Sequence, residues 1–169
     1  MIAPTLTTQR LVLRMPVLAD FPAFAEFWAS PRAQYMGGPC DRAAAWLWFS
    51  SDIAMWHLFG HGALMIDVRL TGETVGQVGI NAGPLYPETE LGWLLYAGHE
   101  GHGYATEAAT ALRDWAFAAL PLASLVSYIY PDNIASAKVA ERLGAVADPD
   151  APRQQGDETD LVYRHRRAA

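Results

Sequence analysis

The chain has 169 residues, of which 51% are hydrophobic and 18% are charged, and its formal net charge is −6 at pH 7. This length suits a single core, so we expect one domain over residues 1–169. The negative charge argues against broad binding to nucleic acid or to an anionic membrane, whereas it tolerates a cationic amine. We also expect no signal peptide and no membrane span. The single Cys40 excludes an intramolecular disulfide, and we predict a cytoplasmic protein.

The hydrophobic pattern of the first part of the chain predicts a strand and two helices. Residues 5–15 alternate apolar and polar side chains, which indicates a half-buried strand. Asp20 is positioned to cap a helix over residues 21–28, which the Ser-Pro pair at 30–31 ends. After a loop at residues 35–39, Asp41 caps a second helix, which carries more aromatic side chains than one core face needs.

The rest of the chain alternates predicted strands with two further helices. Strands are expected near residues 62–70, 74–85, 90–96 and 124–130, with a short hairpin turn between the first two. Helices are expected after residue 103 and from about residue 133 to Gly144, whose glycine ends the second of them. A short strand, a polar loop and a last strand at 159–165 follow. This order predicts a mixed α/β protein built around one sheet.

The stretch from Glu90 to Leu120 predicts a strand, a glycine turn and a helix. The first N–H groups of such a helix have no helical acceptor and lie at its positive dipole end, which suits an anion. Gly101 and Gly103 lack a Cβ, so a pyrophosphate can approach the main chain. The turn continues into residues 104–106 instead of Gly-Lys-Ser/Thr, which excludes a P-loop, and Thr106 fits a dinucleotide fingerprint poorly. An ordinary strand-to-helix loop is the alternative interpretation.

Three motifs in the right order resemble the GNAT acetyltransferase superfamily. Residues 100–105, Glu-Gly-His-Gly-Tyr-Ala, are similar to its acetyl-CoA loop, usually Gln/Arg-x-x-Gly-x-Gly/Ala. Residues 133–145 resemble its Asn-x-x-Ser…Leu-Gly-Phe/Ala segment. Residues 8–14, Thr-Gln-Arg-Leu-Val-Leu-Arg, match the N-terminal motif of the branch that contains ribosomal-protein alanine acetyltransferases. The resemblance implies a single N-acetyltransferase domain over residues 1–169, with a central, mostly antiparallel twisted sheet of about six to seven strands flanked by about four helices.

The resemblance also implies an activity. It is the transfer of an acetyl group from acetyl-CoA to a primary amine, by direct attack in a ternary complex and without a metal. The acceptor would be a small amine, an amino acid, or a peptide or protein N-terminus, and a homodimer would be usual for the family. A non-catalytic acyl-CoA-binding or sensor domain is the alternative, and a structural domain that binds no coenzyme A is a third possibility.

The residues implied for the co-substrate follow the same resemblance. The phosphates would bind the main chain of the glycine turn, and the pantetheine arm would pair with the central strand as an added strand does. A backbone N–H of Leu94 or Leu95 would then polarise the thioester carbonyl. The full set is Trp93, Leu94, Leu95, Glu100, Gly101, His102, Gly103, Tyr104, Ala105, Thr106, Asn133 and Ser136. Asn133 has a second interpretation as a helix cap.

Acetyl transfer needs a neutral amine, because an ammonium has no lone pair. Glu90, at the start of the central strand, is the candidate base, and His99 is a rival by its reference pKa. The alternative for Glu90 is a solvated glutamate at a strand end. For protonation of the leaving thiolate, the tyrosine common in the superfamily is replaced by Ala140. Ser136 is the preferred substitute, and the other candidates are Tyr104, Tyr128 and Tyr130.

Glu100 stands where the family usually has Gln or Arg, and its charge would repel phosphates unless it turns outward. Lys138, Arg142 and Arg113 are candidates to compensate it. The acceptor would enter on the side of the first two helices, where Tyr35, Met36 and Trp46 are the candidate substrate-binding residues, with core packing as the alternative. The histidine pairs His57/His61 and His99/His102 lack completing ligands, so no metal site is expected.

Overall fold

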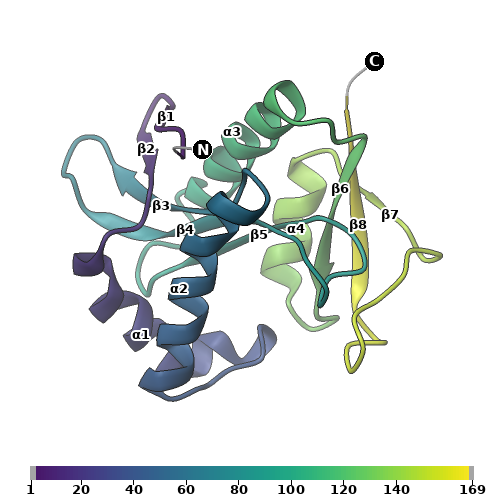
Figure 1. Ribbon diagram of the computed structural model, residues 1–169, viewed down its shortest axis with the longest axis horizontal. Coiled ribbons are helices and arrows are strands. Elements are labelled where there is room, and N and C mark those ends of the chain that lie inside the picture. The colour runs from purple at the N-terminus through teal and green to yellow at the C-terminus, as the bar shows by residue number, and fades with distance from the viewer. Residues whose placement is uncertain (1–2, 168–169) are drawn as a thin grey trace.

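The computed structural model describes residues 3–167, and within this range one sheet of eight strands packs against four α-helices (Figure 1). The strands are β1 (Leu6–Thr7), β2 (Leu11–Arg14), β3 (Ala63–Val68), β4 (Thr74–Asn81), β5 (Glu90–Leu95), β6 (Ser124–Ile129), β7 (Val146–Ala147) and β8 (Leu161–Arg166). The helices are α1 (Phe21–Ala29), α2 (Arg42–Leu58), α3 (Tyr104–Ala119) and α4 (Ile134–Arg142), with short 3-10 helices η1 (Leu18–Asp20) and η2 (Pro31–Tyr35). The predicted mixed α/β class is confirmed.

The sheet has the strand order β1-β2-β3-β4-β5-β6-β8-β7, and among the strand pairs of residues 3–167 only β5–β6 is parallel. These two strands share a single register pair, Glu90 with Val126. The adjacent pairs are longer, since β4 and β5 stay paired over six residues. Beyond Glu90 the facing edge of β5 is therefore free of β6, and this opening lies at the centre of the site described below.

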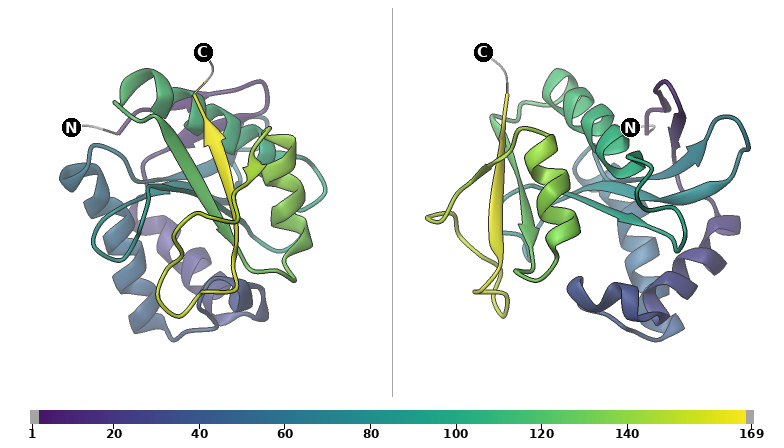
Figure 2. Two further views of the ribbon diagram at one scale, coloured as in Figure 1. Left: turned by 90° about the vertical axis from the view of Figure 1, so that its right-hand side faces the viewer. Right: turned by 180° about the vertical axis from the view of Figure 1, so that it is seen from behind.

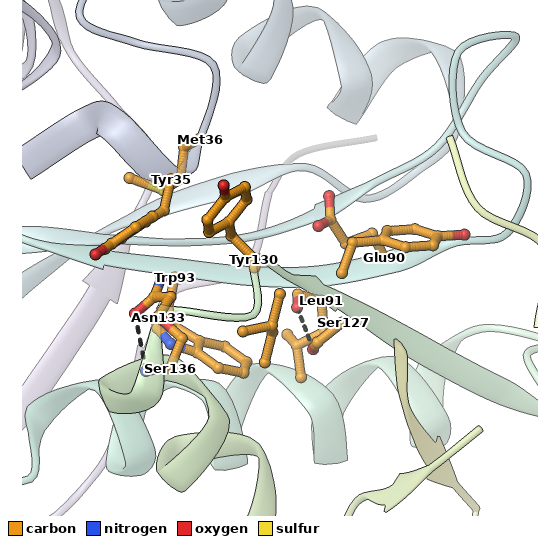
Figure 3. Close-up of a pocket in the computed structure, with 12 residues that line it drawn as sticks. Tyr35, Met36, Glu90, Leu91, Trp93, Ser127, Tyr130, Asn133 and Ser136 are labelled. Carbon is orange, nitrogen blue, oxygen red and sulfur yellow. Dashed lines mark hydrogen bonds between the residues drawn. The ribbon is translucent and has the colours of Figure 1, made fainter. Parts of the chain in front are cut away.

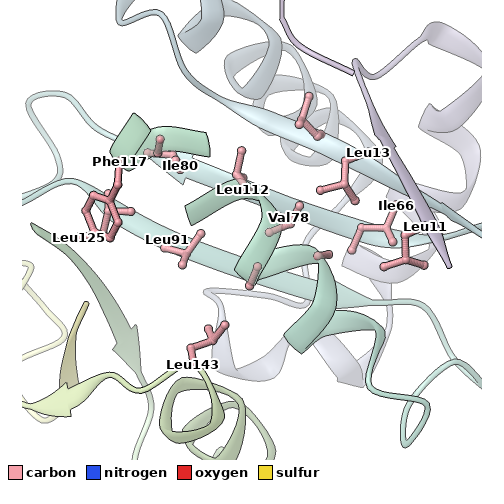
Figure 4. Packing of buried hydrophobic residues seen from close by; sticks show 14 of the residues in the cluster. Leu11, Leu13, Ile66, Val78, Ile80, Leu91, Leu112, Phe117, Leu125 and Leu143 are labelled. Carbon is pink, nitrogen blue, oxygen red and sulfur yellow. The ribbon is translucent and has the colours of Figure 1, made fainter. Parts of the chain in front are cut away.

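The helices cover both faces of the sheet (Figures 1 and 2). Successive side chains of a strand point to opposite faces. Leu91 of β5 packs with Leu112 of α3 in the larger hydrophobic cluster (Figure 4), whereas Leu94 packs with Phe24 and Phe49 of α1 and α2. α3 therefore covers one face and the α1–α2 pair the other. α4 lies beside α3, because Trp93 packs both against the α3 cluster and against Ala137 and Ala140.

Two local predictions near the N-terminus are wrong. The expected continuous strand over residues 5–15 is a tight hairpin, because Thr8 N–H donates to the Leu11 carbonyl and the Thr8 hydroxyl accepts from Leu11 N–H, each at 2.9 Å. This division accounts for the eighth strand, one more than the six to seven that were expected. Asp20 does not cap α1, since its carboxylate accepts two bonds from Arg14 at 2.8 Å and one from Val17 N–H at 2.7 Å.

The cap predicted at Asp41 is confirmed, because its carboxylate accepts from Ala44 N–H at 2.8 Å at the start of α2. Asn133 caps α4 in the same manner, with its side-chain oxygen accepting from Ser136 N–H at 3.2 Å. Across residues 3–167, we find no helix with both the length and the apolar character that a bilayer crossing requires.

Candidate active site

A cleft of about 1210 Å³ runs along the free edge of β5, between η2, the glycine turn and α4. It brings together nearly all of the residues that the sequence assigns to the co-substrate. Those lining it are Trp93, Leu94, Leu95, Glu100, Gly101, Gly103, Tyr104, Ala105, Thr106, Asn133 and Ser136. Segments that extend from Arg10 to Arg142 in the sequence thus form one continuous surface.

The glycine turn leads directly into the N-terminus of α3. Gly101 and Gly103 have φ angles of 78° and 79°, a left-handed conformation that favours glycine. The first hydrogen bond of α3 runs from Glu107 N–H to the Gly103 carbonyl at 3.1 Å, so the preceding N–H groups have no helical acceptor. A Cβ built on Gly101 meets no atom within 4 Å, so the turn opens toward free space. These features fit a phosphate-bearing ligand.

The N-terminal hairpin holds this turn in place. Glu107 of α3 accepts from the Thr8 hydroxyl at 2.6 Å and from the Arg10 main chain and side chain at 2.9 and 2.7 Å. Arg10 also donates to the His102 carbonyl at 2.8 Å, and its guanidinium lies over the Tyr104 ring, 5.1 Å from the centroid. Sequence reasoning used residues 8–14 only as a family signature. It missed this contact, because nothing in local spacing links positions 97 residues apart.

The main chain of β5 offers alternate groups to the cleft. Tyr96 N–H donates to the Val75 carbonyl next to β4, and strand alternation therefore turns Leu94 toward β4 as well. Trp93 and Leu95 lie between these positions, so their N–H and C=O groups face the cleft. Of the two N–H groups considered for the thioester, that of Leu95 is on the cleft side.

Glu100 is neutralised by Arg32 of η2, with which it forms an ion pair at the mouth of the cleft. The carboxylate also accepts from Gly98 N–H at 2.9 Å. Partial burial acts to raise the pKa of Glu100, but its hydrogen bonds and Arg32 outweigh that effect and hold the pKa below its usual value. The same Arg32 donates to the Leu95 carbonyl at 3.1 Å. Sequence reasoning did not identify Arg32.

The three cations proposed earlier as compensation for Glu100 are separated by the fold. Lys138 and Arg142 line the cleft along α4. Arg113 does not line it, because its guanidinium donates to the Leu143 carbonyl at 2.6 Å and to Asp114 at 2.8 Å. Its position on α3 directs it toward the end of α4 instead.

A smaller cavity of about 70 Å³ adjoins the cleft where β5 and β6 separate (Figure 3). The cleft and the cavity share five lining residues, namely Tyr35, Met36, Trp93, Asn133 and Ser136. Glu90 lines only the small cavity. Both candidate catalytic residues, Glu90 and Ser136, therefore border one space, and that space opens onto the predicted path of the co-substrate.

Glu90 lies half-buried at the end of this cavity, with Asn81 of β4 donating to its carboxylate at 2.9 Å. Burial raises the pKa of Glu90 to about 7, although the bonds from Asn81 and from the main chain of Tyr128 act to lower it. A carboxylate with a pKa near the working pH is suited to exchange a proton with an amine.

Asp52 of α2 is a second carboxyl group whose pKa is raised, and the sequence did not predict it. Burial raises its pKa to about 7, in part offset by a hydrogen bond with Gln77. Tyr86 lies near both acids, and burial together with the charges of Glu90 and Asp52 raises its pKa. No sequence pattern identifies Asp52, since it lies in a helix whose many aromatic residues indicate packing in the core.

Several other predicted residues lie apart from the cavity. Trp46 lines neither space, and its ring packs edge-on against Phe21 at 5.0 Å on α1. The His102 ring stacks on Tyr104 at 5.4 Å. His99 lies 3.5 Å from Glu73 and borders neither space, which leaves Glu90 better placed as the base.

Of the tyrosines considered as acids, Tyr128 and Tyr130 line the small cavity and Tyr104 lines the cleft. Within residues 3–167, no group of three or more His, Cys, Asp or Glu side chains is arranged to hold a metal ion.

Comparison with known proteins identifies the family. The protein-family model described as an acetyltransferase (GNAT) domain matches residues 10–146 of this chain. The chain belongs to the GNAT acetyltransferase family. It is an acetyltransferase, and the glycine turn, β5 and α4 that form the cleft all lie within the matched residues.

Two relatives of this GNAT acetyltransferase match most of its length, and a third matches about half. A solved acetyltransferase from Agrobacterium tumefaciens is 60% identical, with a TM-score of 0.94 over 99% of this chain and 96% of that one. The uncharacterized N-acetyltransferase p20 of Bacillus licheniformis is 30% identical over 82% of this chain and 80% of its own. The match to the uncharacterized YkkB of Bacillus subtilis, 35% identical, spans about half of each chain, 51% of both.

More distant structures share the fold of this GNAT acetyltransferase. A ribosomal L7/L12 alpha-N-protein acetyltransferase, RimL, solved in complex with coenzyme A, is 21% identical, with a TM-score of 0.73 over 98% of both chains. At this identity the likeness concerns the architecture alone.

Proposed function

We propose that residues 1–169 form a single N-acetyltransferase domain, which transfers an acetyl group from acetyl-CoA to a primary amine by direct attack in a ternary complex. The acceptor is a small amine, an amino acid, or a peptide or protein N-terminus. The observation that carries the proposal is the junction of two spaces. A long cleft ends at the residues where a small cavity with Glu90 begins, so a thioester and an amine can meet there.

The cleft supports acetyl-CoA as the co-substrate, which supplies the acetyl thioester. The N–H groups at the start of α3 would bind its phosphates, and Gly101 leaves room for them. The main-chain groups of Trp93 and Leu95 on the open edge of β5 would pair with the pantetheine arm. The Leu95 N–H would then stabilise negative charge on the carbonyl oxygen. RimL, which shares the fold, was solved with coenzyme A.

Glu90 would act as the general base. With a pKa of about 7 it is ionised in half of the molecules at neutral pH and can take a proton from a bound ammonium. The amine nitrogen then attacks the thioester carbon, the carbon–sulfur bond breaks, and the thiolate leaves. Ser136 borders both spaces and would act as the acid for the departing sulfur, giving it a proton and regaining one from the attacking nitrogen, which loses its second proton as the amide forms. Asn133 holds the first turn of α4, on which Ser136 is positioned.

Two linked measurements test this function. Isothermal titration of acetyl-CoA should show binding to the wild type. This binding should be lost in Gly101→Glu, which adds a negative charge to the glycine turn where the phosphates would bind. Gly72→Glu is the matched control, because Gly72 has a similar φ of 73° and open space but lies in the β3–β4 turn. Release of coenzyme A thiol with a panel of primary amines should then exceed release without amine. Binding that is equal in both glycine variants, or thiol release that no amine increases, would contradict the proposal.

A further inference from the structure

Two tyrosine rings close the side of the small cavity that faces η2. Tyr35 ends η2 and Tyr130 follows β6 directly, and their rings stack at 5.4 Å between centroids with planes 23° apart. Figure 3 shows Tyr130 between Tyr35 and the Glu90 carboxylate. Both tyrosines line the cavity that Glu90 also lines.

The cavity is small compared with the cleft that it adjoins. Its volume is about 70 Å³, whereas that of the cleft is about 1210 Å³. The space beside Glu90 is therefore far more restricted than the path proposed for the co-substrate. The rest of the wall includes the side chains of Met36, Trp93 and Ile129, which are largely apolar and add to the bulk around the cavity.

We propose that the Tyr35–Tyr130 pair limits the size of the acceptor beside its reacting nitrogen. The preferred acceptors are primary amines whose nitrogen is attached to an unbranched CH₂, and amines with a branched or bulky α-carbon are rejected. Of the acceptors proposed above, this limit keeps the small alkylamines and excludes the α-amino groups of amino acids and of peptide or protein N-termini other than glycine. This inference rests on the proposed function, because it concerns the acceptor side of the same site. Stacking holds each ring against the other, so a bulky group must separate the pair before its nitrogen can reach Glu90.

Tyr130 is the member of the pair that can be changed with the least damage to the fold. It is 43% exposed and lies in the turn before α4. It borders the small cavity and not the cleft, so its removal leaves the co-substrate surface intact. Trp93, by contrast, packs in two hydrophobic clusters and cannot be truncated without loss of core.

The experiment compares propylamine with isopropylamine, isomers that differ only in branching at the carbon bonded to nitrogen. We expect wild-type kcat/KM, measured by thiol release from acetyl-CoA, to favour propylamine about tenfold or more, the discrimination that a pocket achieves for one carbon group. In Tyr130→Ala this ratio should fall toward one through a gain on isopropylamine. Tyr130→Phe keeps the ring and should keep the ratio, and Tyr35→Ala should lower it as Tyr130→Ala does.

The outcomes separate this proposal from the one on which it rests. If Tyr130→Ala binds acetyl-CoA normally but loses activity on both amines equally, the ring has a structural role and the size limit is refuted. A wild-type ratio near one refutes it as well. If no amine increases thiol release in the wild type, the proposed function fails and the size limit fails with it.

Discussion

Replacement of Glu90 by glutamine tests the proposed proton transfer most directly. The amide has nearly the same shape and keeps an oxygen that can accept the 2.9 Å bond from Asn81, so the cavity should persist. What is lost is the group with a pKa of about 7. The two enzymes should therefore differ in how their activity depends on pH, and not only in its size.

The magnitude follows from two protonation equilibria. The wild type binds the ammonium form and needs ionised Glu90, so its kcat/KM should rise about tenfold per pH unit below pH 7 and only about twofold between pH 7 and 9. The Glu90→Gln variant has to use free amine. For an alkylamine with a lysine-like pKa of ~10.4, that is about one molecule in 2,500 at pH 7 and about one in 25 at pH 9. Its activity should rise about 100-fold over the same range.

The assay is steady-state thiol release with acetyl-CoA and a reactive alkylamine from pH 5.5 to 9. At pH 7 we expect the variant to lose about 10²- to 10⁴-fold in kcat/KM. Glu26→Gln, which changes an exposed glutamate of α1, serves as the control and should follow the wild type. If Glu90→Gln shows the same plateau as the wild type above pH 7, then Glu90 is not the base and the reasoning from its burial is wrong.

Four further predictions follow from the contacts of the site. Ser136→Ala should lower kcat about 10²-fold with little change in acetyl-CoA affinity by titration, and an unchanged kcat would mean that the thiolate leaves without an acid. Asp52→Asn should remove part of the pH dependence of the protein's stability. Because burial raises the pKa of Asp52 to about 7, the free energy of unfolding of the wild type should fall by up to ~1.4 kcal/mol per pH unit as pH rises from about 4 to 7. The thermal unfolding midpoint of the variant should therefore exceed that of the wild type by a margin that grows over this range. Glu100→Gln should tighten acetyl-CoA binding several-fold at low salt, because it removes a negative charge and releases Arg32 from its ion pair. The gain in affinity should shrink at 0.5 M salt, and weaker binding by the variant would refute this prediction. Arg10→Met should weaken acetyl-CoA binding and lower the free energy of unfolding in denaturant by ~1–3 kcal/mol, because Glu107 loses its charged partner. An unchanged unfolding midpoint would argue that the Arg10–Glu107 contact does not hold the glycine turn in place.

The parts of the site that the sequence predicted well are those whose residues are neighbours in the chain. The glycine turn and the start of α3 depend on Gly101, Gly103 and the helix that follows, and backbone geometry within a few residues settles them. Glu90 was found because it opens a strand next to that turn. Trp46 was included because its residue type suits a substrate wall, but its ring turns to Phe21 and away from the cavity.

The sequence by itself determined the order of strands and helices, the glycine turn before α3 and the family, because these depend on local pattern and backbone conformation. Only the tertiary structure decided which distant side chains meet. It joined Arg10 to Glu107 across 97 positions, paired Arg32 with Glu100, and stacked Tyr35 on Tyr130. It also decided the chemistry of Glu90, since the pKa of a carboxyl depends on how much water the surrounding chain leaves around it, and no local pattern contains that information.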